Sequence, residues 1–102
     1  MKKIISHLQK AFDHRVRLGI MSILMVNEWV DFNSLKEALE TTDGQLASHI
    51  KALEKEKYLE IRKRFIGKKP NTSYRVTPAG KEAFTQHLNA LEQLLSSTRK
   101  KD

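Results

Sequence analysis

The stretch RKRFIGKKPNTSYR, residues 62–75, decides the fold of this 102-residue chain. Its central part, GKKPN at 67–71, consists of turn-forming and basic residues, and it separates two segments in which apolar residues alternate with polar ones. We therefore expect a β-hairpin with a loop of about five residues. The residues expected to face the core are Leu59, Ile61 and Phe65 in the first strand and Tyr74 and Val76 in the second, with Lys63 breaking the pattern where the hairpin leaves the core.

The same stretch is strongly basic. It contains six Lys or Arg residues and no Asp or Glu, so it supplies +6 of the formal net charge of +7 at pH 7. Such clustering favours a polyanionic partner, although a solvated, solubilising surface would have the same composition. The arrangement of the elements around the hairpin has to decide between these two interpretations.

Composition narrows the classes of function. The chain has no Cys, which excludes disulfides and thiolate metal sites. Its longest apolar stretch, residues 19–26, is far shorter than the roughly 20 residues that cross a bilayer, and its N-terminus lacks the apolar core of a signal peptide. We expect one soluble, cytoplasmic domain spanning residues 1–102.

Two short helices with a break of three or four residues are predicted before the hairpin. Ser34 and Glu37 have the spacing of a capping box, with Asn33 as the alternative cap, and Leu35, Ala38 and Leu39 are expected to point inward. Thr42, three residues before Gln45, opens the next helix, which is expected to run to about Lys57. This spacing is typical of a helix-turn-helix, here over about residues 34–57, followed by a wing at about 58–77.

Further helices are predicted at both ends of the chain. Residues 4–12 have helical apolar spacing, Asp13 is the expected cap of a helix from 14 to about 26, and Thr77-Pro78 opens a long last helix over about 78–98. Their apolar stripes predict a dimer interface, although the two terminal helices could instead pack on each other within one chain. The predicted interface residues are Ile4, Ile5, Leu8, Phe12, Phe84, Leu88, Leu91 and Leu95. Trp29 and Phe32 are expected in or near the core.

Over nearly its whole length the sequence resembles small MarR/ArsR-like winged-helix transcriptional regulators. The phrases that carry the resemblance are HRVRLGIMSIL (14–24), DFNSLKEAL (31–39), LASHIKALEKEKYLEI (46–61) and YRVTPAGKEAF (74–84). The resemblance implies a mainly α fold with a small β-hairpin (α+β), a winged helix-turn-helix, and dimerisation through the terminal helices. Such regulators often have a small-molecule pocket at the dimer interface, although no residue here points to a ligand.

The helix expected to open at Thr42 has one face suited to DNA. Leu46, Ile50 and Leu53 fall on its inner arc, while the opposite arc has small, polar and basic residues and no acid. Such a helix fits a major groove about 12 Å wide, although an ordinary solvated face is the alternative. The predicted DNA-binding residues are Gln45, Ser48, His49, Lys51 and Lys55 in this helix and Arg62, Arg64, Lys68, Lys69, Asn71 and Arg75 in the wing. Ser34 is also predicted, because the N-terminal amides of its helix could hold a phosphate, although a simple cap is the alternative.

The tip of the wing is expected to lie on the backbone or in the adjacent minor groove, where cations gain from the negative potential. Three or four phosphate contacts per subunit would give a dimer a slope of log K against log salt of roughly −5 to −7.

These features predict a sequence-specific, homodimeric regulator of double-stranded DNA, which we expect to be a repressor. The alternative is a winged helix that binds protein or RNA without choosing a DNA sequence. We expect no enzyme, because no nucleophile is paired with a base, and no cofactor. A metal site is not expected either, because the four histidines, His7, His14, His49 and His87, include no pair at the i, i+4 spacing.

Overall fold

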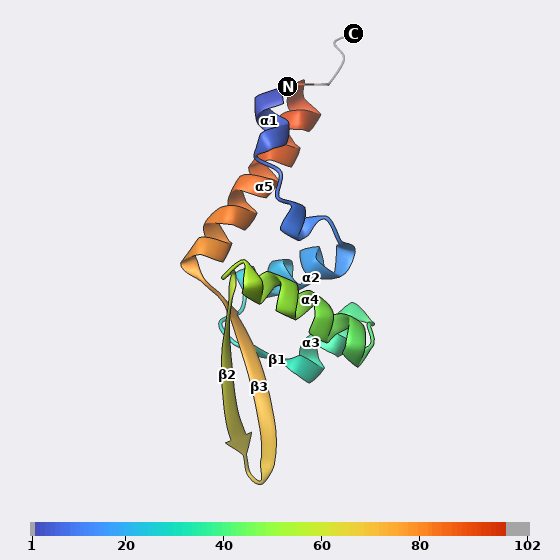
Figure 1. Ribbon diagram of the computed structural model, residues 1–102, viewed down its shortest axis with the longest axis vertical. Helices are drawn as coiled ribbons and strands as arrows, with labels where there is room; N and C mark the ends of the chain where they lie inside the picture. Colours follow the sequence, from blue (N-terminus) through green and yellow to red (C-terminus); the bar gives the residue numbers. More distant parts are fainter. Residues whose placement is uncertain (1, 98–102) are drawn as a thin grey trace.

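The computed structural model describes residues 2–97, which form five α-helices, one 3-10 helix and three β-strands (Figure 1). The hairpin of β2 and β3 extends from the helices α2, α3 and α4 in the direction opposite to α5 (Figure 1). This arrangement confirms the α+β winged-helix class. In chain order the elements are α1 (Lys2–Ser6), η1 (Lys10–Phe12), α2 (Arg15–Met25), β1 (Val30–Asp31), α3 (Phe32–Leu39), α4 (Asp43–Lys55), β2 (Leu59–Ile66), β3 (Lys69–Val76) and α5 (Pro78–Ser97).

The core lies where α2, α3 and α4 pack against the base of the sheet. The inner arc predicted for α4 is confirmed, since Leu46 and Leu53 are fully buried and Ile50 is 3% exposed. On α3, Leu35 is buried but Ala38 is exposed, so the inward position predicted for Ala38 is wrong. The other fully buried apolar residues are Phe12 in η1 and Ile20, Met21 and Leu24 in α2. None of the helices within residues 2–97 is both long and apolar enough to cross a membrane.

The helix predicted over residues 4–12 is interrupted. Gln9 has an extended backbone conformation (φ −101°, ψ 123°), and its N–H donates to Nδ1 of His87 on α5, at 3.0 Å. That long-range bond replaces a helical one, so α1 ends at Ser6 and a separate 3-10 turn follows. The interruption depends on a residue 78 positions away, which local spacing does not reveal.

Two of the predicted helix caps are wrong, and two are confirmed. His14, and not Asp13, caps α2, because its Nδ1 accepts from the N–H of Val16 at 3.1 Å. Asp31, and not Ser34 or Asn33, caps α3. Thr42 caps α4 as expected, and Thr77 accepts from the N–H of Gly80 at 3.0 Å at the start of α5.

The wing is a tighter hairpin than the sequence indicated. Ile66 pairs with Lys69, so the turn has only two residues, Gly67 and Lys68, and the predicted five-residue loop is wrong. Gly67 has φ +64°, as expected for Gly at the first central position of a type II′ turn. The sheet also has a third strand, since the short β1 pairs antiparallel with β3, giving the order β1-β3-β2. This third strand joins the base of the wing to the body.

We expect Gly80→Ala to destabilise the protein by about 1–3 kcal/mol, because Gly80 touches backbone where α5 docks against the base of the wing. A Cβ there would lie 2.5 Å from the carbonyl oxygen of Tyr58 and 2.9 Å from Cγ2 of Val76. Chemical denaturation would measure the change. Gly44→Ala is the matched control, because a Cβ at Gly44 has no heavy atom within 4 Å. Equal stability of the two variants would show that α5 can shift without cost.

Candidate nucleic-acid interface

The outer face of α4 is open to solvent. Gln45, Ser48, Lys51 and Lys55 are all exposed, as the helical arc predicted. Gln45 is also oriented, since the hydroxyl of Thr41 donates to its Oε1 at 2.9 Å. The surface that this helix presents therefore has hydrogen-bonding groups near its N-terminus and two cations further along.

His49 has a different position from the rest of this predicted set. It is half-buried, its Nδ1 accepts from Nε of Arg17 at 3.0 Å, and its ring lies 4.1 Å from the ring of His14. Burial lowers the pKa of His49, and the nearby His14 and Arg17 lower it further, so the ring is neutral near pH 7. His49 therefore lies at the joint between α2 and α4, at the margin of the exposed face, and its contacts with Arg17 and His14 help to hold the angle of α4.

The six cations of the wing fall into two groups. Lys63, Arg64, Lys68 and Lys69 are exposed, whereas Arg62 and Arg75 are half-buried at the base. The guanidinium carbons of Arg62 and Arg75 lie 4.3 and 4.6 Å from the ring centroid of Trp29. Arg75 also forms an ion pair with Glu60, to which its Nε donates at 2.9 Å. The two arginines predicted to face a duplex therefore hold the wing to the body.

Trp29 itself was expected in or near the core, but it lies on the outer face of the sheet. It is half-buried and precedes β1, the strand that pairs with β3. Cation–π contacts of this kind contribute about 0.5–2 kcal/mol each, so two of them help to fix the orientation of the wing. Clustering of basic residues in the sequence could not show which arginines would find an aromatic partner.

Asn71 and Ser34, both predicted to contact DNA, already have side-chain hydrogen bonds within the chain. Asn71 lies opposite Arg64 within the strand pair, and its Oδ1 accepts from the Ser73 hydroxyl at 3.1 Å, so it is not at the tip. The Ser34 hydroxyl donates to the Asp31 carboxylate at 2.6 Å. This bond, together with backbone N–H donors, lowers the pKa of Asp31. Asp31 therefore puts a negative charge at the N-terminus of α3, which opposes a phosphate there.

The predicted dimer surface separates into buried and exposed residues. Phe12 and Phe84 are 1% and 3% exposed and form an edge-to-face pair with centroids 5.2 Å apart, so they belong to the chain's own core. Leu88, Leu91 and Leu95 on α5 are 44%, 40% and 74% exposed. On the N-terminal segment, Ile5 is exposed, while Ile4 and Leu8 are half-buried. An apolar stripe thus remains uncovered along the outer side of α5.

His87 is a core residue that was not predicted from the sequence. It is 5% exposed, packs edge-on against Phe12 with centroids 5.2 Å apart, and accepts the Gln9 N–H. Burial lowers its pKa, although Asp13 acts in the opposite direction. Its spacing could have indicated this position, because His87 lies four residues after Ala83 and three after Phe84, on the same side of α5 as these two buried residues.

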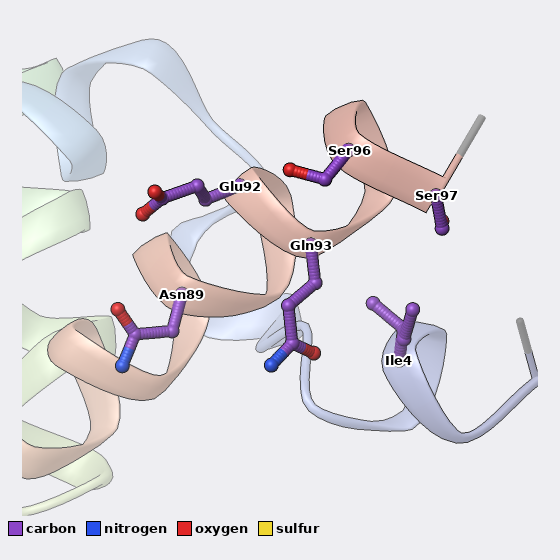
Figure 2. Close-up of a pocket in the computed structure, with 6 residues that line it drawn as sticks. All are labelled: Ile4, Asn89, Glu92, Gln93, Ser96 and Ser97. Atoms are coloured by element: carbon purple, nitrogen blue, oxygen red, sulfur yellow. The ribbon is translucent and has the colours of Figure 1, made fainter. Parts of the chain in front are cut away.

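An open hollow of about 570 Å³ lies between α1 and α5 (Figure 2). Its lining is polar except for Ile4, and Figure 2 shows Gln93 of α5 facing the same space as Ile4 of α1. This lining differs from the mainly apolar pockets that hold most small ligands. Within residues 2–97, no group of three or more His, Cys, Asp or Glu side chains is placed to hold a metal ion.

Comparisons with known proteins agree with this geometry. Residues 16–95 match a family model described as a winged helix DNA-binding domain. An uncharacterized protein of Methanocaldococcus jannaschii is 36% identical over 85 residues, which cover 83% of this chain and 92% of that protein. The structure of a transcriptional regulator homologue from Pyrococcus horikoshii is 27% identical, covers 98% of this chain and 100% of its own, and superposes with a TM-score of 0.86.

More distant structures share the fold. NadR, solved in complex with 4-hydroxyphenylacetate, is 16% identical with a TM-score of 0.70, and the match covers 95% of this chain and 68% of NadR. The structural neighbours also include a MarR-family regulator from Porphyromonas gingivalis and an ArsR-family regulator, with TM-scores of 0.61 and 0.57. The family model thus confirms the winged helix that the resemblance implied, and MarR- and ArsR-family regulators share its fold.

Proposed function

The chain belongs to the family of winged helix DNA-binding domains, and from that premise we propose that it is a sequence-specific transcriptional regulator, acting in the cytoplasm as a homodimeric repressor. The observation that carries this proposal is the outer face of α4, where Gln45, Ser48, Lys51 and Lys55 are exposed together. Family and fold are those of transcriptional regulators, which are not enzymes.

We infer that α4 occupies the major groove and reads bases through Gln45 and Ser48. The amide of Gln45 can bond an adenine edge in bidentate fashion, and the hydroxyl of Ser48 can bond either base of a pair. Lys51 and Lys55 would meet phosphates and set the position of the helix along the groove. Buried Leu46, Ile50 and Leu53 hold the opposite side of α4 against the body, which presents this face as a rigid unit.

A dimer is supported by the exposed stripe of Leu88, Leu91 and Leu95 on α5. One recognition helix contacts only a few base pairs, so a twofold dimer would read two half-sites roughly 34–36 Å apart, which is one turn of the duplex. Because a dimer holds both half-sites at once, its affinity exceeds that of one subunit.

In vitro site selection, followed by a mass measurement of the complex, tests the whole proposal. We expect enrichment of an inverted repeat and a mass that corresponds to two chains on one duplex. Equal, weak binding to every duplex and to RNA, with no enriched site, would favour the alternative of a winged helix used as a protein or RNA interaction module. Repression would then be tested with a reporter gene placed behind the selected site.

Replacing Lys68 and Lys69 together with alanine is expected to weaken binding to all duplexes by a similar factor. Both side chains are exposed at the tip of the wing, so we assign them to phosphates or to the minor groove. Removing one phosphate contact should make the slope of log K against log salt less steep by about 0.9. Glu56→Gln is a suitable control, because Glu56 is exposed and lies outside both α4 and the wing. An unchanged slope together with an altered choice of site would contradict this division of roles.

We also propose that a small molecule modulates the binding of DNA, as an extension of the likeness to the fold of NadR. A thermal-shift screen of metabolites, repeated with the selected duplex present, would identify such a compound. An effector that opposes binding of DNA should stabilise the free protein. It should also lower the affinity for the duplex by the same factor by which the duplex lowers the affinity for the effector.

A further inference from the structure

The tip of the wing has exposed apolar side chains beside its cations. Phe65 and Ile66, the two residues before the turn, are 73% and 57% exposed. Phe65 was expected to face the core, and it does lie on the core side of the sheet, but the hairpin has already left the body at that point (Figure 1). Burying an exposed Phe side chain completely contributes roughly 1.5–3 kcal/mol, and Phe65 leaves most of this unrealised, which favours a partner at this position.

Phe65 is part of a small apolar surface at the end of the hairpin. Its strand partner is Pro70, which is also exposed, and the two share one face of the hairpin because directly opposed residues point to the same side. On the other face, Ile66 is opposite Lys69. The tip is thus apolar on one side and mixed apolar and basic on the other, and it ends in a turn of only two residues.

The charge around this surface indicates which partner covers it. Residues 62–75 contain six basic residues and no acid. A second copy of the same tip would be repelled by this charge, whereas a polyanion would be attracted. Phe, Ile and Pro are residues that DNA-bending proteins insert between base steps from the minor groove.

We propose that the wing tip is an apolar wedge, in which Phe65, supported by Pro70, presses into the minor groove beside the recognition helix, partly unstacks one base step and bends the duplex. This inference rests on the proposed function, since it requires α4 to dock in the adjacent major groove. The exposed cations Lys68 and Lys69 hold the flanking phosphates while the wedge enters.

The dimensions of the groove explain why insertion and bending are coupled. Two paired strands are about 4.8 Å apart before their side chains are counted, and the minor groove of B-DNA is about 6 Å wide. A ribbon with a Phe at its tip therefore enters only if the groove opens, which bends the duplex toward the major groove. Flexible TA or CA/TG steps open at the lowest cost, so the wing selects such a step without any hydrogen bond to a base.

The test uses the duplex that the wild-type protein enriches from a random pool, labelled at both ends for energy transfer. With wild-type protein we expect the ends to approach and a 2-aminopurine placed at the wing step to brighten as it unstacks. Phe65→Ala should abolish both signals and lower the affinity about tenfold, with the salt slope unchanged because no charge is removed. Phe65→Leu, which keeps an apolar wedge, should restore most of the bend.

Lys63→Ala is the matched control, since Lys63 lies on the same face of β2, two residues nearer the body. It should make the salt slope less steep and leave the bend intact. If Phe65→Ala binds and bends the selected duplex as the wild type does, the wedge proposal is wrong, whereas the proposed function as a regulator is unaffected. The wedge is also overturned if Phe65→Ala turns a dimer into a monomer by light scattering, because Phe65 would then belong to a contact between copies. Failure of the wild type to enrich any duplex would overturn the proposed function and the wedge together.

Discussion

Leu91→Glu is expected to convert the proposed dimer to a monomer and to lower the affinity for a duplex with two half-sites by roughly 10²- to 10⁴-fold, the gain that linking two binding modules provides. Leu91 is in the middle of the exposed stripe on α5, three residues after Leu88 and four before Leu95. In a twofold interface every residue appears twice, so one substitution places two buried carboxylates near the same axis. Light scattering would measure the mass, and a gel shift would measure the affinity.

Gln86→Glu is the matched control for this substitution. It adds the same carboxylate to the same helix at an exposed position almost directly opposite the stripe. We expect it to remain a dimer with only a small loss of affinity, from added negative charge. If the wild type is already a monomer at micromolar concentration and still enriches an inverted repeat, the stripe has another partner and the dimer must be assembled by the DNA.

The two sides of α5 show what helical spacing can and cannot predict. Spacing correctly predicted the long helix and its abundance of apolar residues, but it grouped Phe84 with Leu88, Leu91 and Leu95 as one interface. In the structure Phe84 packs against Phe12, while the leucines remain exposed. Which side of such a helix is internal depends on where the N-terminal segment returns, and that return is fixed by the bond from Gln9 to His87. A contact 78 residues apart is set by the tertiary fold, so local pattern does not contain it.

The wing shows the same limit in a strand pair. Alternation and Gly67 correctly predicted the first strand and the turn, but the second strand begins at Lys69, inside the stretch 67–71 that was expected to be loop. The charge of the wing followed from simple counting. The assignment of each cation did not, because Arg62 and Arg75 find Trp29 only after β1 pairs with β3. Likewise, Phe65 continues the core-facing alternation but lies beyond the core that this alternation implies. Period-two patterns indicate which face a side chain occupies, and only the length of the hairpin beyond the body decides whether that face is covered.

Gln45→Ala and Ser48→Ala are each expected to relax the choice of base by about 1–3 kcal/mol at one position of each half-site. The preferred base pair loses binding energy because its edge stays desolvated in the groove without a hydrogen-bonding partner. An alternative base pair at that position made no such hydrogen bond to the wild type, so its affinity changes little. Competition gel shifts between the selected site and single-base variants would measure the loss. The two variants should affect different base pairs, since these side chains are three residues apart along α4.

The same helix provides the control that separates base reading from general attraction. Lys55→Ala removes an exposed cation near the C-terminal end of α4, so it should lower the affinity for every duplex by a similar factor and preserve the order of preference.

Thr41 offers a second test of base reading, because its hydroxyl, just before α4, donates a hydrogen bond to Oε1 of Gln45. Thr41→Val should therefore reproduce part of the Gln45→Ala effect at the same base pair. If Gln45→Ala and Ser48→Ala instead lowered the affinity for all duplexes equally, α4 would be a phosphate-binding helix, and the choice of sequence would have to come from the deformability that the wing detects.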